Sequence, residues 1–580
     1  MSRLTIMFAV LLLAVSVVLA PVAHAAAAAK VVISGSSAMW QSMALAAYNN
    51  NACVTGGTAP CFHYTSGSNF NLTDTRPPSK GGSNVTDTGA VWIVWDSSAG
   101  PNVWAYIKVD SVVGNRCYFA QPHCNINVAT FPAAGNQISS KLWGDSTSDT
   151  LPPAAVQALF TAGVQVNTAA TDIRPEDALF AQCRSNSTLG GGTDSLKGLG
   201  YGGNASGVCP TFASPLANLV GSAILSGYPA STASANNVAF AILGRDPFTN
   251  TTIPVASTIS VGASPIVFIT NRTGALASVT NATDSQVQTV FSGANCDASV
   301  FGAPAGVIEA YLREPLSGTM NTTEASVFRY PDVSGKSQET GVAAMNPLAA
   351  KPCTAGGNRY RAIGTGEEVK SVLNSNVNNG HDGIGYAFFS YGNVSTIANN
   401  AAYGYLQLNG IDPIFHKYGT TLDPGQPTTA GMLPGAANLP AACAADFPCA
   451  ENKIWSGNLS FPNVRNGQYR AWSVLRVVTN GAPLPDVRNL VLGSQKYNVT
   501  TVPDFIPALA VNGNPADPGL KLLRSHYTQS GVPPTNIAGA GDKGGDMGGC
   551  VLHSSGQSIT SDTTTKLAQT FPGSACVLVP

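Results

Sequence analysis

Short apolar runs alternate with segments of helix-forming composition along much of this 580-residue chain. Val31–Ile33 forms such a run, and a turn rich in hydroxyl groups, 34–37, leads from it into a predicted helix over 38–48. Further apolar strands are predicted over 259–271 and 382–389, with helices between them. Strands and helices that alternate at these lengths predict α/β domains.

The chain is too long for one compact core and is expected to form about two or three domains. Charged residues make up only 11% of it and the formal net charge is −1, so no broad basic surface exists for nucleic acid or for a membrane. Any anion that this protein binds must be held by local geometry.

The first residues have the pattern of a secretory signal peptide, which we place at 1–25. An apolar run from Ile6 to Val22 ends at Ala23-His24-Ala25, a cleavage site of small residues. A membrane helix is the alternative, but no polar or basic stop follows the run. The site carries no cysteine for a lipid anchor, so we expect a periplasmic or secreted protein without a membrane anchor.

Twelve cysteines suit an exported protein, in which an even count favours disulfide bonds. We expect neighbours along the chain to pair because short loops close most easily. No Cys-x-x-Cys motif is present and the seven histidines are scattered, so no metal site is expected. The expected pairs are Cys53–Cys61, Cys117–Cys124, Cys183–Cys209, Cys296–Cys353, Cys443–Cys449 and Cys550–Cys576.

Two segments have the composition of an oxyanion site. Arg313 is followed four residues later by Ser317-Gly318-Thr319 and by a segment that can continue as a helix. Amides at a helix start, two hydroxyls and a guanidinium together suit a tetrahedral oxyanion, and glycine lets the backbone approach it closely. Ser36 and Ser37 provide a second such turn before a helix. Ordinary loop chemistry and a plain serine N-cap explain these patterns as well.

Two regions stand apart from the alternating pattern. Residues 68–130 are interpreted as an insertion, in which 90–95 and 103–109 form a β-hairpin. The last segment, 513–580, is rich in glycine and is expected to be tied to itself by a disulfide.

Taken in order, the motifs resemble those of the periplasmic phosphate-binding proteins, which have a two-lobed type II fold. The turn 34–37 is similar to the first anion loop, and Thr171-Asp172 resembles a Ser-Asp pair after the second strand. The helix that ends in Phe291-Ser292-Gly293 resembles another signature, and the Arg313 segment resembles the Arg-x-x-x-Ser-Gly-Thr loop. Asp382 begins a segment similar to a Gly-x-Ile-Gly-Tyr strand, with aspartate in place of the first glycine.

The resemblance implies two α/β lobes with a ligand cleft between them. It places lobe 1 at 30–260, lobe 2 at 261–402 and a return to lobe 1 at 403–512. It also implies capture of inorganic phosphate, or a similar oxyanion, for an ABC transporter in the membrane, without a cofactor and without catalysis. The implied ligand-binding residues are Ser36, Ser37, Asp172, Arg313, Ser317, Gly318 and Thr319.

Within that site, Asp172 is the candidate that distinguishes phosphate from sulfate, because its carboxylate can accept the proton that phosphate retains near neutral pH. Asp172 can instead cap the helix that starts at Pro175 or pair with Arg174. Three other functions stay open: a hydrolase, for which no Gly-x-Ser-x-Gly or His-Glu-x-x-His motif is present, a structural or adhesive extracellular protein that reuses the fold, and a binder of another oxyanion.

Overall fold

The computed structural model describes residues 25–49, 61–76, 85–133, 149–175, 178, 181, 240–242, 244–314, 316–328, 338, 350–362, 364–389, 403–413, 463 and 468–496. The predicted signal peptide up to residue 24, the loop between Cys183 and Cys209 and the predicted tail at 513–580 lie outside the described residues.

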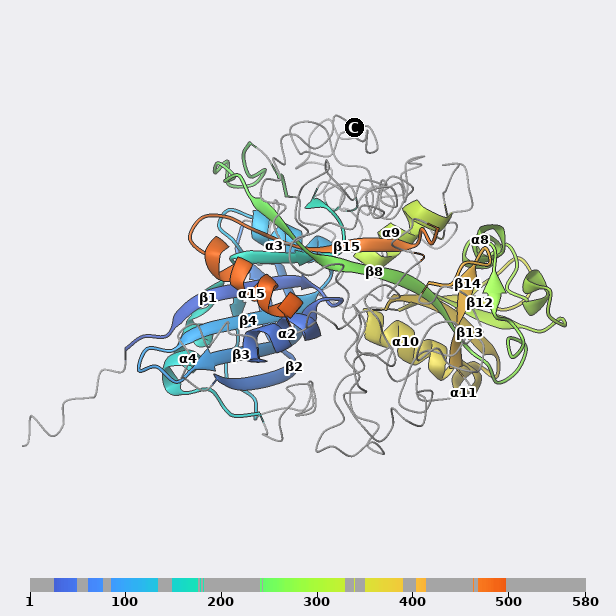
Figure 1. The fold of residues 1–580 in the computed structure, drawn as a ribbon, viewed down its shortest axis with the longest axis horizontal. Helices are drawn as coiled ribbons and strands as arrows, with labels where there is room; N and C mark the ends of the chain where they lie inside the picture. Colours follow the sequence, from blue (N-terminus) through green and yellow to red (C-terminus); the bar gives the residue numbers. More distant parts are fainter. Residues whose placement is uncertain are drawn as a thin grey trace, which may run out of the picture.

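The described elements form two α/β lobes that lie side by side (Figure 1). The first lobe has a sheet in which β15, β7, β1, β4, β3, β2, β5 and β6 are neighbours in that order. Its strands are β1 (Ala28–Ser36), β2 (Cys61–Asp74), β3 (Val85–Asp96), β4 (Asn102–Val109), β5 (Asn125–Asn127), β6 (Val164–Gln165), β7 (Thr168–Thr171) and β15 (Trp472–Thr479). Its helices are α2 (Trp40–Asn49), α3 (Ser111–Phe119), α4 (Ala154–Ala162) and α15 (Leu484–Lys496).

The second lobe has a smaller sheet in the order β11, β12, β10, β13. Its strands are β9 (Asn281–Ala282), β10 (Ile308–Arg313), β11 (Lys351–Pro352), β12 (Asn358–Ala362), β13 (Asp382–Phe388) and β14 (Tyr403–Leu408). Its helical elements are α8 (Asp284–Phe291), the 3-10 turn η1 (Ala298–Phe301), α9 (Gly318–Thr323), the π-helical turn η2 (Glu324–Phe328), α10 (Thr365–Leu373) and α11 (Ser375–Asn379).

One long strand, β8 (Ser257–Asn271), connects the two sheets, and Figure 1 shows it running from one lobe into the other. Its first part, 257–265, pairs with β15 of the first lobe. From Ile266 onward it pairs with β13 and then also with β14 in the second lobe. The strand predicted over 259–271 is therefore the crossover between the lobes.

Both faces of the first sheet are buried, which explains why its strands read as continuous apolar runs. In β1, Val31 and Ile33 belong to one apolar cluster and Val32 to the other. Strand side chains point alternately to opposite faces, so a short run such as this one contributes to two cores at once.

The interpretation of 68–130 as an insertion needs correction. The predicted hairpin exists as β3 and β4, which pair in antiparallel fashion. However, β4 also pairs in parallel with β1, so the hairpin is part of the main sheet of the first lobe. The position of the hairpin is decided by hydrogen bonds between β4 and β1, which is far away in the sequence. The local pattern of a hairpin does not reveal this pairing.

The strand β14 lies in a different lobe from the one that the sequence assigns to 403–512. It pairs with the second part of β8 and with β9, both within the second lobe. The next described strand of the chain, β15, is the one that joins the first sheet, where it pairs with β7.

Asp382, the aspartate that stands in place of a glycine in the motif, stabilises the second lobe. Its carboxylate accepts hydrogen bonds from Thr273 Oγ1 at 2.8 Å, from Gly274 N at 2.8 Å and from Leu276 N at 2.9 Å. These bonds fix the turn that follows β8 against the start of β13.

Candidate functional site

The predicted site residues come from both lobes and meet where the lobes face each other. Ser36 ends β1 and Ser37 follows it, while Asp172 follows β7, all in the first lobe. Arg313 ends β10, and Ser317 precedes α9 in the second lobe. Strand ends and helix starts therefore supply the site, as is common for ligand sites in α/β proteins.

One close approach between the lobes brings Asp172 to the start of α9. A Cβ atom on Gly318 would overlap Asp172 Oδ1 and would lie 2.8 Å from Ser111 Oγ. Ser111 Oγ donates a hydrogen bond to Asp172 Oδ1 and accepts one from Asp172 N at 3.2 Å. A Cβ at 318 would therefore force the Asp172 side chain to move, and Ser111 orients the carboxylate that faces Gly318.

Arg313 lies at the centre of a second set of contacts. Its Nε and Nη2 atoms donate to the two carboxylate oxygens of Glu314, each at 2.8 Å. Its Nη1 atom donates to Thr365 Oγ1 at 2.6 Å, and Thr365 Oγ1 lies 3.4 Å from Ser37 Oγ. Thr365 therefore connects the arginine of the second lobe to the serine turn of the first.

Arg313 Nη2 also reaches Asp110 Oδ1 of the first lobe, at 3.4 Å. Asp110 immediately precedes α3, so this contact, like the one between Ser37 and Thr365, crosses between the lobes. The guanidinium of Arg313 thus contacts carboxyl groups from both lobes.

The buried charges around Arg313 shift one another's pKa values. Burial by itself would lower the pKa of Arg313, but the carboxylates of Glu314, Glu368 and Asp110 raise it above its ordinary value. Burial raises the pKa of Glu314, and the Arg313 charge outweighs this and lowers it to about 2. Burial raises the pKa of Glu368 well above its ordinary value. Arg313 and Glu314 therefore form a buried ion pair.

The helix starts at the boundary between the lobes differ in how they are capped. Ser317 Oγ caps α9 by accepting from Met320 N at 3.2 Å, and Thr319 is buried in the first turn. Ser36 Oγ accepts from Ala38 N at 3.1 Å. By contrast, the residue before α3, Asp110, makes no side-chain capping hydrogen bond. The first backbone N–H groups of α3 therefore have no acceptor on the Asp110 side chain and are available to donate hydrogen bonds to an anion.

The structure adds four residues that the sequence did not single out. Asp110 and Ser111 follow β4, Glu314 follows Arg313 directly, and Thr365 opens α10. The only local signal for Asp110-Ser111 is a polar pair between an apolar strand and a helix, which is also the pattern of an ordinary N-cap. Glu314 could have been noticed as the charged neighbour of the candidate arginine.

Two disulfide bonds are present in the described part of the chain, Cys117–Cys124 and Cys296–Cys353. Both are neighbouring pairs of the kind that the sequence predicts. Cys61 has a free thiol, and its predicted partner Cys53 lies outside the described residues. The other predicted pairs, Cys183–Cys209, Cys443–Cys449 and Cys550–Cys576, also lie outside them.

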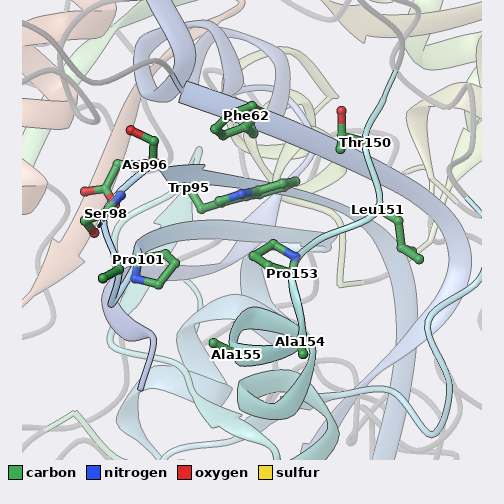
Figure 2. A pocket seen from close by; sticks show the side chains of 12 residues that line it. Phe62, Trp95, Asp96, Ser98, Pro101, Thr150, Leu151, Pro153, Ala154 and Ala155 are labelled. Atoms are coloured by element: carbon green, nitrogen blue, oxygen red, sulfur yellow. Dashed lines mark hydrogen bonds between the residues drawn. The ribbon is translucent and has the colours of Figure 1, made fainter. Parts of the chain in front are cut away.

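A separate pocket of about 500 Å³ lies in the first lobe, beside the turn between β3 and β4 (Figure 2). Phe62 and Trp95 stack at one side of it, with ring centroids 5.9 Å apart. Leu151 and Pro153, which precede α4, line another side. None of the predicted oxyanion residues lines this pocket, so it is distinct from the site between the lobes.

No helix within the described ranges is long and apolar enough to cross a membrane. Among the same residues, no group of three or more His, Cys, Asp or Glu side chains is arranged to hold a metal ion.

Comparison with known proteins gives similar solved structures but no matching family model and no matching curated protein. A putative phosphate ABC transporter substrate-binding protein from Clostridium perfringens, with bound phosphate, is 14% identical, with 46% of this chain and 72% of that chain covered and a TM-score of 0.24. An ABC-type phosphate transport receptor from Vibrio cholerae is 13% identical, with 43% and 71% covered and a TM-score of 0.22. An ancestral soluble variant of the human phosphate-binding protein is 13% identical, with 90% and 97% covered and a TM-score of 0.32.

Proposed function

We propose that this chain is an exported solute-binding protein that captures inorganic phosphate, or a similar oxyanion, between its two lobes. The observation that carries the proposal is the convergence of Arg313, Asp172 and Gly318 at the boundary between the lobes. A permanently charged guanidinium, a carboxylate and a close backbone approach are the three features that a partly protonated oxyanion needs.

Each group has a definite role in this proposal. Arg313, held in place by Glu314, offers positive charge and N–H donors. Ser37, Ser111 and Thr319 offer hydroxyls, and the starts of α3 and α9 offer backbone amides. Asp172 accepts the ligand's proton, which phosphate carries near neutral pH and fully ionised sulfate lacks. The arrangement suits binding rather than catalysis, because its arginine and glutamate form a fixed pair instead of an activated nucleophile and base.

The wider setting of this function is also part of the proposal. We infer that residues 1–25 direct export, that the mature protein works in the periplasm or beyond the cell, and that it delivers its ligand to an ABC transporter. The signal-peptide pattern of the first residues supports export. The transport role follows from the proposed capture of a nutrient anion by a two-lobed receptor.

Calorimetric titration of the phosphate-stripped mature protein with phosphate, arsenate and sulfate tests the function. We expect tight binding of phosphate and arsenate, weak or no binding of sulfate, and a loss of binding in Arg313→Ala. A matched control is Arg245→Ala, since Arg245 is exposed and donates to Asn250 O at 2.6 Å away from the site. In Asp172→Asn we expect sulfate to bind relatively better, because the repelling carboxylate is gone.

Two results would decide against the proposal. If no anion binds the wild-type protein, the chain is not an oxyanion receptor and a structural role of the fold becomes the better explanation. If Arg313→Ala and Arg245→Ala bind phosphate equally well, the ligand lies elsewhere.

A further inference from the structure

Asp110 occupies an N-cap position but does not act as a cap. It directly precedes α3, where an aspartate usually accepts a hydrogen bond from the first turn, and it makes none. Its carboxyl oxygen Oδ1 instead accepts a hydrogen bond from Arg313 Nη2. Arg313 lies 203 positions further along the chain and in the other lobe. The side chain is 17% exposed, so solvent can still reach it.

Two carboxyl groups compete for the same guanidinium. Glu314 holds Arg313 through two hydrogen bonds of 2.8 Å, while Asp110 makes one longer contact of 3.4 Å. Two ionised carboxylates in contact repel each other strongly, so one of them retains its proton. Glu314 has the better geometry and takes the charge, which leaves the proton on Asp110.

We propose that Asp110 is a positioning residue that latches the two lobes together, and that closing the lobes on an oxyanion requires a proton on its carboxyl group. The inference rests on the proposed function, since it describes how that site closes. With its proton, Asp110 donates a hydrogen bond to Glu314 and bridges the lobes. Without this proton, Asp110 and Glu314 are both ionised beside the same arginine, and their negative charges repel each other.

The charges that face Asp110 agree with this assignment. Burial raises the pKa of Asp110 well above its ordinary value, and Glu314 and Asp172 raise it further, against the opposing effect of Arg313. These groups come from both lobes, and Glu368 of α10 adds another carboxyl 3.8 Å from Arg313. Lys108 of β4 is the nearest lysine along the chain, and its ammonium lies over the Trp40 ring, 4.6 Å from the ring centroid.

The direction of the pH dependence follows from linkage. In separated lobes we expect Asp110 to have an ordinary carboxyl pKa of about 3.9. The closed state has the raised pKa, so closure takes up a proton at any pH between the two values. Ligand affinity is then greatest at low pH and falls by up to about tenfold per pH unit as the pH rises through this window.

The test compares three variants with the wild-type protein in phosphate titrations from about pH 5 to about pH 8. Asp110→Asn keeps the size and a hydrogen-bond donor but cannot ionise, so its affinity is expected to lack the pH-dependent loss. Asp110→Ala removes the bridge and is expected to bind more weakly at every pH. Asp96→Asn, at the end of β3, serves as a control and is expected to follow the wild type. Phosphate's own titration affects all four proteins alike and cancels in the ratios.

Small-angle scattering of the ligand-free proteins separates failure of the latch from failure of the function. The latch predicts that wild-type protein becomes more extended as the pH rises and that Asp110→Asn does not. A constant affinity ratio between wild type and Asp110→Asn, with phosphate still bound, would overturn the latch and leave the receptor function standing. If phosphate does not bind to the wild-type protein, the proposed receptor function is wrong. If the scattering profile of that protein is also independent of pH, the proposed role of Asp110 in closing the lobes is wrong as well.

Discussion

Replacement of Gly318 by alanine is the most direct test of how the lobes meet. The backbone at 318 does not adopt a positive φ angle, so alanine is compatible with the local structure of the second lobe. The added Cβ, however, would overlap the Asp172 carboxylate of the first lobe. The substitution therefore penalises the closed arrangement and leaves each lobe intact.

The size of the effect follows from the cost of crowding a packed site. Overpacking by one methyl group typically costs about 1–3 kcal/mol, which corresponds to about 5- to 150-fold in an equilibrium constant. We expect phosphate affinity, measured by calorimetry, to fall within this range. Neighbouring hydroxyls such as Ser111 cannot absorb the overlap, because a Cβ at 318 would lie only 2.8 Å from its Oγ.

Gly306→Ala provides a matched control within the second lobe. A Cβ there would lie 2.7 Å from Ala275 Cβ, so the substitution crowds the lobe but not the cleft. We expect it to lower the unfolding temperature and to leave the phosphate affinity unchanged. Wild-type affinity in Gly318→Ala would refute the reasoning, since it would mean that Gly318 and Asp172 are not in contact when ligand is bound.

Three further predictions concern stability. Glu314→Gln leaves the buried Arg313 without its main partner and should lower the free energy of unfolding by about 3–5 kcal/mol in urea titrations. Because the pKa of Glu314 is lowered to about 2, its contribution is complete above the ordinary carboxyl pKa and is lost as the pH falls toward 2, a loss that the variant should not show. Asp382→Ala removes the acceptor of three hydrogen bonds and should cost at least about 1–3 kcal/mol with unchanged phosphate affinity; an unchanged urea midpoint would contradict this. Replacing Cys296 and Cys353 by serine opens a link across 57 residues and should cost about 2–5 kcal/mol, whereas a loss below 1 kcal/mol would argue against a stabilising bond.

Part of the candidate site was accessible from the sequence. Arg313 and Ser317-Gly318-Thr319 lie within seven residues of one another, so a local pattern can identify them. Ser111 and Asp172 are 61 residues apart and meet only because α3 packs across the paired strands β1 and β7. The sequence analysis did not single out Asp110, and its contact with Arg313 depends on the approach of two lobes.

The fold shows the same division. The strand at β8 and the helices α2, α8 and α10 follow from apolar runs, helix-forming composition and, for α8, the glycine that ends it. The structure adds the capping box of α8, in which Thr283 and Gln286 bond each other's backbone. The hairpin of β3 and β4 was recognised, but its partner β1 was not. Periodicity reveals that a segment is a strand, and it contains no information about which distant strand will pair with it.

The sequence by itself determined many of the strands and helices and their α/β class, because each depends on residues that are neighbours along the chain. The two lobes and the oxyanion residues were expected from the order of motifs that resemble those of the periplasmic phosphate-binding proteins. Only the tertiary structure decided that β4 belongs to the main sheet, that β14 lies in the second lobe, and that Asp110, Ser111 and Thr365 join the site. These features arise from hydrogen bonds and charge contacts between segments up to 328 residues apart, as between Ser37 and Thr365. Such contacts depend on how the sheets and lobes pack, which no local pattern encodes.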